Sequence, residues 1–182
     1  MNEKIRQWMN NDELYDRYVS FPLKTPFHIV KFIRDYIPEI ELVERDISQK
    51  GISGFIKEEN DGKIYICVHQ FDNKNRKRFT IAHELGHYFR HRDKIKEGFV
   101  DGIGVGAFGR DTAENKVIQE EIDANEFAGE ILMPEVEFKN IYNYKKGNIT
   151  AVAEFFMVSE AAAYTRAKLL GFPVNDYCTY FM

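Results

Sequence analysis

Residues 79–89 read FTIAHELGHYF, and this stretch decides the fold. His83 and His87 stand four positions apart, so on a helix they lie on one face and can bind the same metal ion. Apolar residues on either side of the pair give such a helix a face for a core, and we predict a helix over residues 80–91. Gly86 costs about 1 kcal/mol in a helix interior. That cost indicates that another segment of the chain approaches closely at Gly86.

The two histidines suit a catalytic zinc site. Zinc accepts imidazole nitrogen readily, and a catalytic site has three protein ligands and one position open to water. Glu84 is turned about 100° around the helix from His83, where it reaches a bound water more easily than the metal. We therefore predict Glu84 as the general base. The alternative is an ordinary polar helix, since a string of this kind occurs by chance in roughly one chain per hundred of this size.

A second predicted helix, residues 112–133, offers a third ligand. Glu121 and Asn125 lie one turn apart on one face of this helix. Ala124 and Ala128 share that face, and their small side chains let the helix pack closely beside the first one. We predict that Glu121 completes the metal site and that Asn125 holds a ligand histidine in place.

Other residues near this motif are alternative candidates for the site. Glu120 and Asp123 are alternative ligands, although acidic residues in the first half of a helix also suit its dipole without a metal. Asp123 and His91 are further candidates to support the ligands. His91 is not expected to bind the metal, because a catalytic zinc keeps one position free. The donor that steadies an oxyanion is left open among Tyr142, Tyr144, His91 and His69.

The region before the histidine motif predicts a small β-sheet. Candidate strands cover residues 40–47, 52–57 and 63–69. Asn60-Asp61-Gly62 separates the last two and is a good hairpin signal. Together with the helices, this predicts an α+β fold. In it, a small antiparallel three-stranded sheet packs with the HExxH helix and with the second ligand-bearing helix.

The remaining segments predict helices and one loop. Apolar residues at helical spacing indicate a core-facing helix over residues 27–37. Residues 98–111 are rich in glycine and are expected to form a loop. The end of the chain predicts a helix-turn-helix-like tail of two short helices, with Thr150 capping the first and Ser159 capping the second.

These elements suggest three parts. Residues 1–20 are polar and are predicted to be a loosely docked N-terminal extension with helical character. Residues 21–140 would form a metallopeptidase domain, and residues 141–182 a helical tail packed on it.

Composition narrows the class of protein further. A net charge of −4 and a pI near 5.8 argue against a dedicated nucleic-acid binder, which carries a basic excess. The two cysteines are far apart and form no CxxC pair. Neither a secretory signal nor an apolar stretch of the ~18 residues of a membrane helix is evident. We therefore expect no membrane partner and a cytoplasmic location.

Two segments together resemble the ImmA/IrrE-type metallopeptidase family. They are RFTIAHELGH at residues 78–87 and EIDANEFAGEILMP at residues 121–134, and the pair is far more specific than either half. The tail, residues 152–171, is similar to the compact helical end of that family, so the likeness covers roughly residues 25–172. Asp123 stands where this family more usually has Glu.

The resemblance implies a gluzincin-like site. In such a site His83, His87 and Glu121 bind one zinc ion per chain, and Glu84 activates a water on it. The donor set does not by itself distinguish zinc from another divalent ion such as manganese. The implied function is a zinc-dependent endopeptidase that cleaves a regulatory protein, either a helix-turn-helix repressor or an antitoxin-like partner.

Two alternative functions remain. One is a regulator that binds a partner without cleaving it and uses zinc structurally. The other is a DNA-binding regulator that uses its helical tail, although the second tail helix offers only Arg166 and Lys168 as cations. Recognition of DNA normally needs several phosphate and base contacts, so nucleic-acid binding is not expected.

Overall fold

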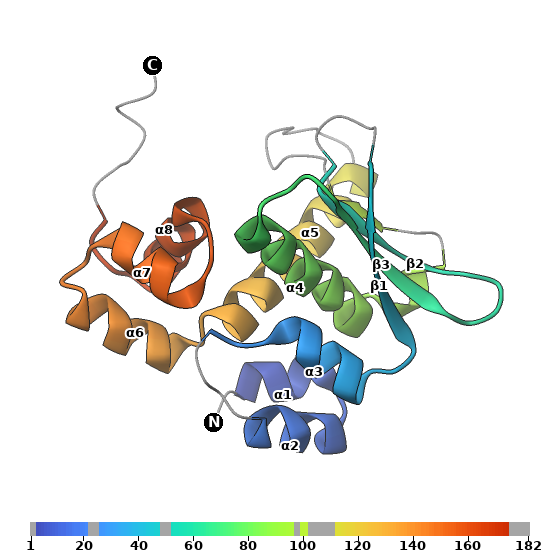
Figure 1. The fold of residues 1–182 in the computed structure, drawn as a ribbon, viewed down its shortest axis with the longest axis horizontal. Coiled ribbons are helices and arrows are strands. Elements are labelled where there is room, and N and C mark those ends of the chain that lie inside the picture. Colours follow the sequence, from blue (N-terminus) through green and yellow to red (C-terminus); the bar gives the residue numbers. More distant parts are fainter. Residues whose placement is uncertain (1–2, 22–25, 48–51, 97–98, 102–111, 175–182) are drawn as a thin grey trace.

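The computed structural model describes residues 3–21, 26–47, 52–96, 99–101 and 112–174 of the 182-residue chain. These residues form helices around a small sheet, which confirms the predicted α+β class (Figure 1). In chain order the elements are α1 (Glu3–Met9), α2 (Asp12–Ser20), α3 (Ile29–Tyr36), β1 (Ile40–Arg45), β2 (Gly54–Glu58), β3 (Ile64–His69), α4 (Lys74–Arg90), the short 3-10 helix η1 (Arg92–Lys94), β4 (Phe99–Asp101), α5 (Thr112–Leu132), α6 (Glu135–Tyr144), α7 (Ile149–Phe156) and α8 (Glu160–Leu169).

The sheet is mixed, with the strand order β1-β3-β2-β4. β2 and β3 form the predicted antiparallel hairpin, and Gly62 adopts a φ of +81° in its turn, a conformation that costs glycine nothing. The prediction of an entirely antiparallel sheet is wrong, because β1 pairs with β3 in parallel. β3 is the most apolar strand and takes the interior position between β2 and the more polar β1, which lies at the edge.

β4 is a fourth strand, and it lies in the segment that was predicted to be a loop. It spans three residues and pairs antiparallel with the free edge of β2. A strand this short is stabilised by pairing with its neighbour. Three residues are too few to show the alternating pattern from which a strand is predicted. Residues 102–111 of the predicted loop lie outside the described residues.

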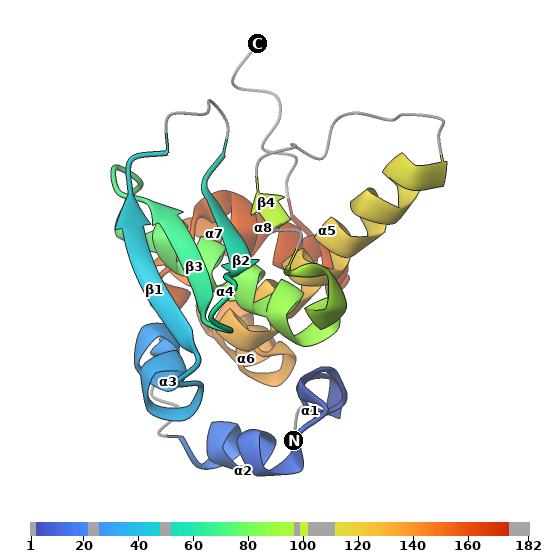
Figure 2. The same cartoon turned by 90° about the vertical axis from the view of Figure 1, so that its right-hand side faces the viewer.

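α4 lies against one face of the sheet and α5 lies beside α4 (Figure 2). Ile56, Ile64 and Ile66 of the sheet are fully buried, as is Leu85 of α4. The sheet and α4 approach most closely at Gly54, where a Cβ atom would lie 2.4 Å from the Thr80 side chain. The core thus holds one side of the histidine helix against the sheet.

The interface between α4 and α5 is built on small residues. A Cβ atom at Gly86 would lie 2.9 Å from the Cα atom of Ala124, which is closer than real Cβ atoms approach backbone. The predicted close approach at Gly86 is therefore confirmed, and the approaching segment is α5. Gly86 brings the two helices together at the point where they carry the predicted ligands.

The N-terminal residues 3–20 form α1 and α2, and their apolar side chains belong to the same core as the rest of the chain. Ile5, Tyr15 and Tyr18 are buried. α1 lies below α4 and α5 in Figure 1 and contacts both. The division of the chain into residues 1–20, 21–140 and 141–182 stays a prediction.

The tail consists of α6, α7 and α8. Ser159 caps α8 as predicted, with its hydroxyl accepting a hydrogen bond from Ala162 N at 3.1 Å. The predicted cap of α7 is wrong, because Asn148 rather than Thr150 accepts the bond from Ala151 N, at 3.0 Å. Asparagine and threonine can both cap a helix. Asn148 is the one that precedes the first turn of α7, where its side chain reaches the backbone N–H three residues later.

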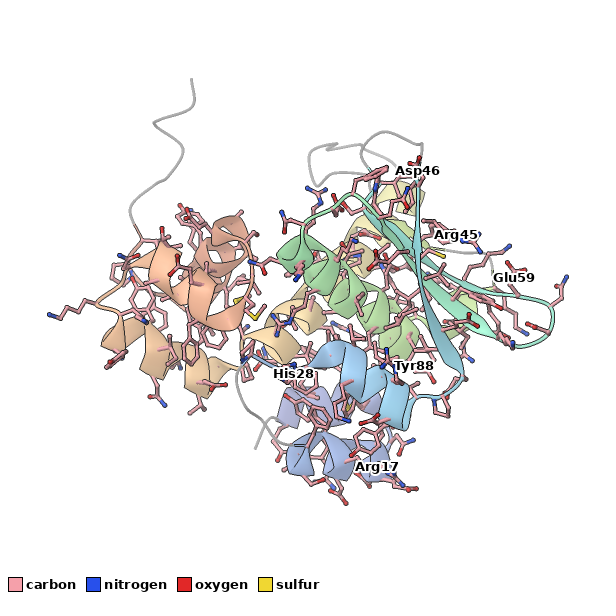
Figure 3. All side chains as sticks on the ribbon, in the orientation of Figure 1. Arg17, His28, Arg45, Asp46, Glu59 and Tyr88 are labelled. Carbon is pink, nitrogen blue, oxygen red and sulfur yellow. The ribbon has the colours of Figure 1, made fainter. Side chains whose placement is uncertain are left out.

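Polar contacts tie the tail to the histidine helix. Arg78 of α4 donates to the carbonyls of Phe156 at 2.6 Å and Met157 at 3.0 Å, at the end of α7. Burial lowers the pKa of Arg78 to about 10, so it stays charged at neutral pH. Figure 3 shows the tail and the central helices with their side chains, in the orientation of Figure 1. Among the described residues, none of the helices has the length and apolar character to cross a lipid bilayer.

Candidate metal centre

α4 presents the histidine motif from its buried half. The helix begins at Lys74, six residues before the predicted start, because the Asn73 side chain accepts a hydrogen bond from Arg76 N at 2.9 Å and caps it. Every residue from Thr80 to His87 is buried. His83 is 3% exposed, and Glu84 and His87 are 0% exposed. Polar groups buried to this degree are costly unless they are partnered or bind a metal.

The structure brings His83, His87 and Glu121 to one point. The two Nε2 atoms lie 3.1 Å apart. The carboxylate of Glu121 spans both rings, with one oxygen 3.2 Å from His83 Nε2 and the other 3.3 Å from His87 Nε2. One ligand atom from each residue lies within 4.8 Å of the others. This spacing suits three side chains that share one ion.

Glu121 is ionised in this position. Burial alone would raise the pKa of its carboxyl group, but hydrogen bonds from His83 and His87, together with their charge, lower the pKa to about 2. An ionised carboxylate beside two imidazole nitrogens is the donor set found in catalytic zinc sites with two histidines and one glutamate. The residues present therefore fit a zinc ion.

Asn125 lies against the first ligand histidine. Its Oδ1 atom is 3.1 Å from His83 Nδ1, on the side of the ring away from Nε2. A proton on Nδ1 that points at an amide oxygen leaves the Nε2 lone pair directed at the metal position. The contact is the one expected for a residue that holds a ligand histidine in place.

Glu120 and Asp123, the alternative ligands on α5, point elsewhere. Glu120 is buried and pairs with Lys94. Asp123 pairs with Arg90 at 3.1 Å and lies 3.9 Å from His91 Nε2. Neither belongs to the group formed by the two histidines and Glu121.

His91 packs beside the site but outside the ligand group. Its ring lies 5.5 Å from the ring of His87. Burial, and after it the charge of His87, lowers the pKa of His91 to about 4, so its ring is neutral at neutral pH. A supporting role for His91 stays a prediction.

Of the four residues considered as oxyanion donors, three lie in other parts of the chain. Tyr142 donates its hydroxyl to the Pro173 carbonyl within the tail. Tyr144, on the same helix, is 76% exposed. His69 accepts a hydrogen bond from Phe71 N at 3.2 Å. Among the contacts of the described residues, those of His91 reach the site, and those of the other three do not.

Arg90 is a residue near the site that the sequence pattern does not single out. It stands three positions after His87 and donates to the Asp123 carbonyl at 3.1 Å. The spacing of basic and acidic residues within one helix does not reveal such a contact, because Arg90 reaches a second helix 33 residues further along the chain.

Residues 38–168 match the family model described as the IrrE N-terminal-like domain, peptidase family M78. This match covers more than half of the chain. The chain belongs to the M78 peptidase family. Membership confirms the resemblance seen in the two sequence segments. The M78 family is associated with zinc and includes regulators as well as peptidases.

A solved structure supports the fold of this M78 domain. It is described as a Mycobacterium tuberculosis transcriptional regulator, shares 19% sequence identity and has a TM-score of 0.60. The likeness covers 91% of this chain and 51% of that chain, so this chain spans about half of that protein's length. Identity this low shows a shared fold alone. No curated protein matches the chain.

Proposed function

We propose that this M78 domain is a zinc-dependent endopeptidase that cleaves a regulatory protein in the cytoplasm. The observation that carries the proposal is the convergence of His83, His87 and Glu121 within 4.8 Å, next to the buried Glu84. A site that served only the fold would need four protein ligands, whereas three leave a position for water and substrate. Another divalent ion, such as manganese, could bind the same donors, because the donor set does not by itself select the metal.

The residues of the chain divide the chemistry between them. When bound, zinc supplies Lewis acidity to a substrate carbonyl and to a water molecule. Glu84 follows His83 directly on α4 and is fully buried. Glu84 takes the proton from the attacking water and returns it to the leaving amine. Asn125 keeps the His83 ring in orientation throughout.

The substrate class that we propose is a helix-turn-helix repressor or an antitoxin-like partner. Membership of a peptidase family that includes regulators supports a regulatory substrate. The structural relative whose description is a transcriptional regulator fits the same setting. The cytoplasm is the compartment of such partners, and the buried free thiol of Cys67 suits a reducing environment.

DNA binding through the tail has less support. Arg166, one of the two cations on α8, is 5% exposed and pairs with the buried Glu130. The other, Lys168, lies over the ring of Tyr164 at 5.3 Å. A recognition helix needs cations that can reach phosphates and bases. Arg166 is buried in an ion pair and does not offer its charge to DNA.

Coexpression with a panel of full-length helix-turn-helix repressors tests the proposal. Mass spectrometry would identify new amino termini in each repressor. We expect one repressor to be cut by the native chain, and Glu84→Gln to slow the cut by about 10²–10⁴-fold while it retains zinc. His83→Ala should lose both zinc and cleavage. Cleavage by Glu84→Gln at the native rate would refute the mechanism. A stable uncut complex with the native chain would favour the binding regulator with a structural zinc.

A further inference from the structure

α1 lies outside the region matched to the M78 family, yet it contacts both helices that carry the ligands. The match covers residues 38–168, and α1 ends at Met9. Figure 2 shows α1 beside the end of α4, and contacts join it to α4 and to α5. An element that bridges two helices can control how they lie against each other.

Trp8 is the residue of α1 that makes this bridge. Its ring lies 4.9 Å below the guanidinium carbon of Arg90, on α4. The same ring packs against Phe127 of α5, with the ring centres 6.0 Å apart. A guanidinium over the face of a tryptophan is the most favourable arrangement of a cation and an aromatic ring. Trp8 thus holds the planar head of Arg90 in one orientation.

Arg90 in turn joins α4 to α5. Its Nη2 atom pairs with an Asp123 carboxylate oxygen at 3.1 Å, and its Nη1 atom donates to the Asp123 backbone carbonyl at 3.1 Å. Nη1 also lies 3.8 Å from Glu126. The Arg90 and Asp123 side chains are 20% and 18% exposed. A charged fork that grips both a carboxylate and a backbone oxygen is stronger and more directional than an exposed ion pair.

The metal centre depends on the register between these two helices. Arg90 lies three residues after His87, and Asp123 lies two residues after Glu121. Between the helices stand Gly86 and Ala124, which allow close packing but offer no large side chains to interlock. A slip of one residue along a helix moves a ligand by about 1.5 Å, whereas metal–ligand distances tolerate about 0.2 Å. Phe89 of α4 packs against Phe127 of α5 with the ring centres 5.5 Å apart. A directional polar contact would add to this apolar one in preventing such a slip.

We propose that Arg90, oriented by Trp8, is a positioning residue that fixes α4 against α5 and so sets the spacing of His87 and Glu121. The inference rests on the proposed metal site. It gives the N-terminal segment a part in the function of the M78 domain. Lys4 of α1 adds an exposed ion pair to Glu126 at 3.1 Å, which contributes little by itself.

Arg92 is a matched control two residues further along. Its guanidinium lies 5.0 Å from the ring of Tyr88, and it pairs with Glu58 of β2 at 3.1 Å. It therefore has the same kind of stacked and paired geometry as Arg90. Tyr88 lies beside α3 in Figure 3, and the partners of Arg92 are on α4 and the sheet rather than on α5.

The test measures the metal site of the full chain without any substrate. Zinc affinity is obtained by competition with a chelator, and the visible absorption of the cobalt(II)-loaded protein reports ligand geometry. We expect Arg90→Ala to weaken zinc binding about tenfold and to change the cobalt spectrum. Trp8→Ala should weaken zinc binding by a smaller factor. Trp8→Phe, which keeps an aromatic ring, should retain most of the native zinc affinity. Arg92→Ala should leave both readouts unchanged.

Native affinity together with a native cobalt spectrum in Arg90→Ala would overturn the inference. Should Arg90→Ala fail to fold, Arg90→Lys keeps the charge but loses the planar fork. An intermediate affinity in Arg90→Lys supports the inference, and values equal to the native chain contradict it. A native chain that binds zinc no better than His83→Ala would instead remove the proposed metal site itself. The two failures are therefore distinguishable.

Discussion

Two regions of the molecule bury charged side chains between helices, and they do so in opposite ways. In the tail, Arg166 of α8 pairs with the carboxylate of Glu130 and donates to the Met133 carbonyl at 3.0 Å. The second carboxylate oxygen of Glu130 accepts a hydrogen bond from Glu135 N at 3.2 Å. The positive charge of Arg166 and the negative charge of Glu130 are therefore paired with each other inside the protein.

Between α4 and α5 the buried groups are arranged in another way. His83, His87 and Glu121 converge on one point, with one ligand atom of each within 4.8 Å of the others. The comparison teaches that burial of charge does not by itself mark a functional site. A buried cation with a matching anion anchors a helix, whereas two imidazoles and a carboxylate that converge on one point form the donor set of a metal site.

The largest effect expected is on the anchor in the tail. Arg166→Ala leaves the carboxylate of Glu130 buried without its cation, and such a change costs about 3–5 kcal/mol. Chemical denaturation would measure the loss in the free energy of unfolding. Zinc per folded molecule should not change. Lys168→Ala, on the same helix, is the control and should change stability by less than about 0.5 kcal/mol. Similar losses in both variants would show that Arg166 is no anchor.

A smaller effect is expected at the contact between the ligand helices. In Gly86→Ala the new methyl group meets the backbone of Ala124 at 2.9 Å. The helices must move apart, which costs about 1–3 kcal/mol, and zinc affinity should fall as Glu121 is displaced. Gly129→Ala on α5 is the control, since its Cβ would meet nothing closer than 3.9 Å. Unchanged zinc affinity in Gly86→Ala would mean that close packing does not set the ligand spacing.

Next in size is the contact that orients His83. Asn125→Ala removes the oxygen that lies 3.1 Å from His83 Nδ1. Loss of such a support lowers metal affinity about tenfold at least, with little effect on folding because Asn125 is only partly buried. Chelator competition would measure the affinity. Asn125→Asp keeps an acceptor and should retain most of it, so equal losses in both variants would count against an orienting role.

The smallest effect tests the corrected cap of α7. Asn148→Ala removes the acceptor for Ala151 N and should cost about 1 kcal/mol of stability. Thr150→Ala should cost less, because Thr150 lies inside the helix rather than at its cap. Thermal unfolding of the two variants would compare them. A larger loss in Thr150→Ala would restore the cap that the sequence predicted.

Local patterns were enough to predict the centre of the molecule. The four-residue spacing of His83 and His87 places both on one helix face, and Gly86 indicates the close helix beside it. The turn at Asn60-Asp61-Gly62 predicts the β2–β3 hairpin, because its partners are adjacent in sequence. Such features depend on residues a few positions apart, which the sequence displays directly.

Features that depend on distant segments could not be predicted in this way. The parallel pairing of β1 follows from β3 taking the interior position, which the pattern of β1 does not reveal. β4 exists because the edge of β2 is available to it. The contacts from Arg90 to Trp8 and Asp123 join three helices. Each of these is a choice between partners that only the folded chain brings within reach.

The central claim is that His83, His87 and Glu121 share one metal ion, and the zinc content of the purified chain tests it most directly. Elemental analysis of natively purified protein should find one zinc ion per chain in the native protein and in Glu84→Gln. His83→Ala and Glu121→Ala should lose it while remaining folded by circular dichroism. Equal zinc in all four proteins, or zinc in none of them after incubation with the metal, would contradict the account.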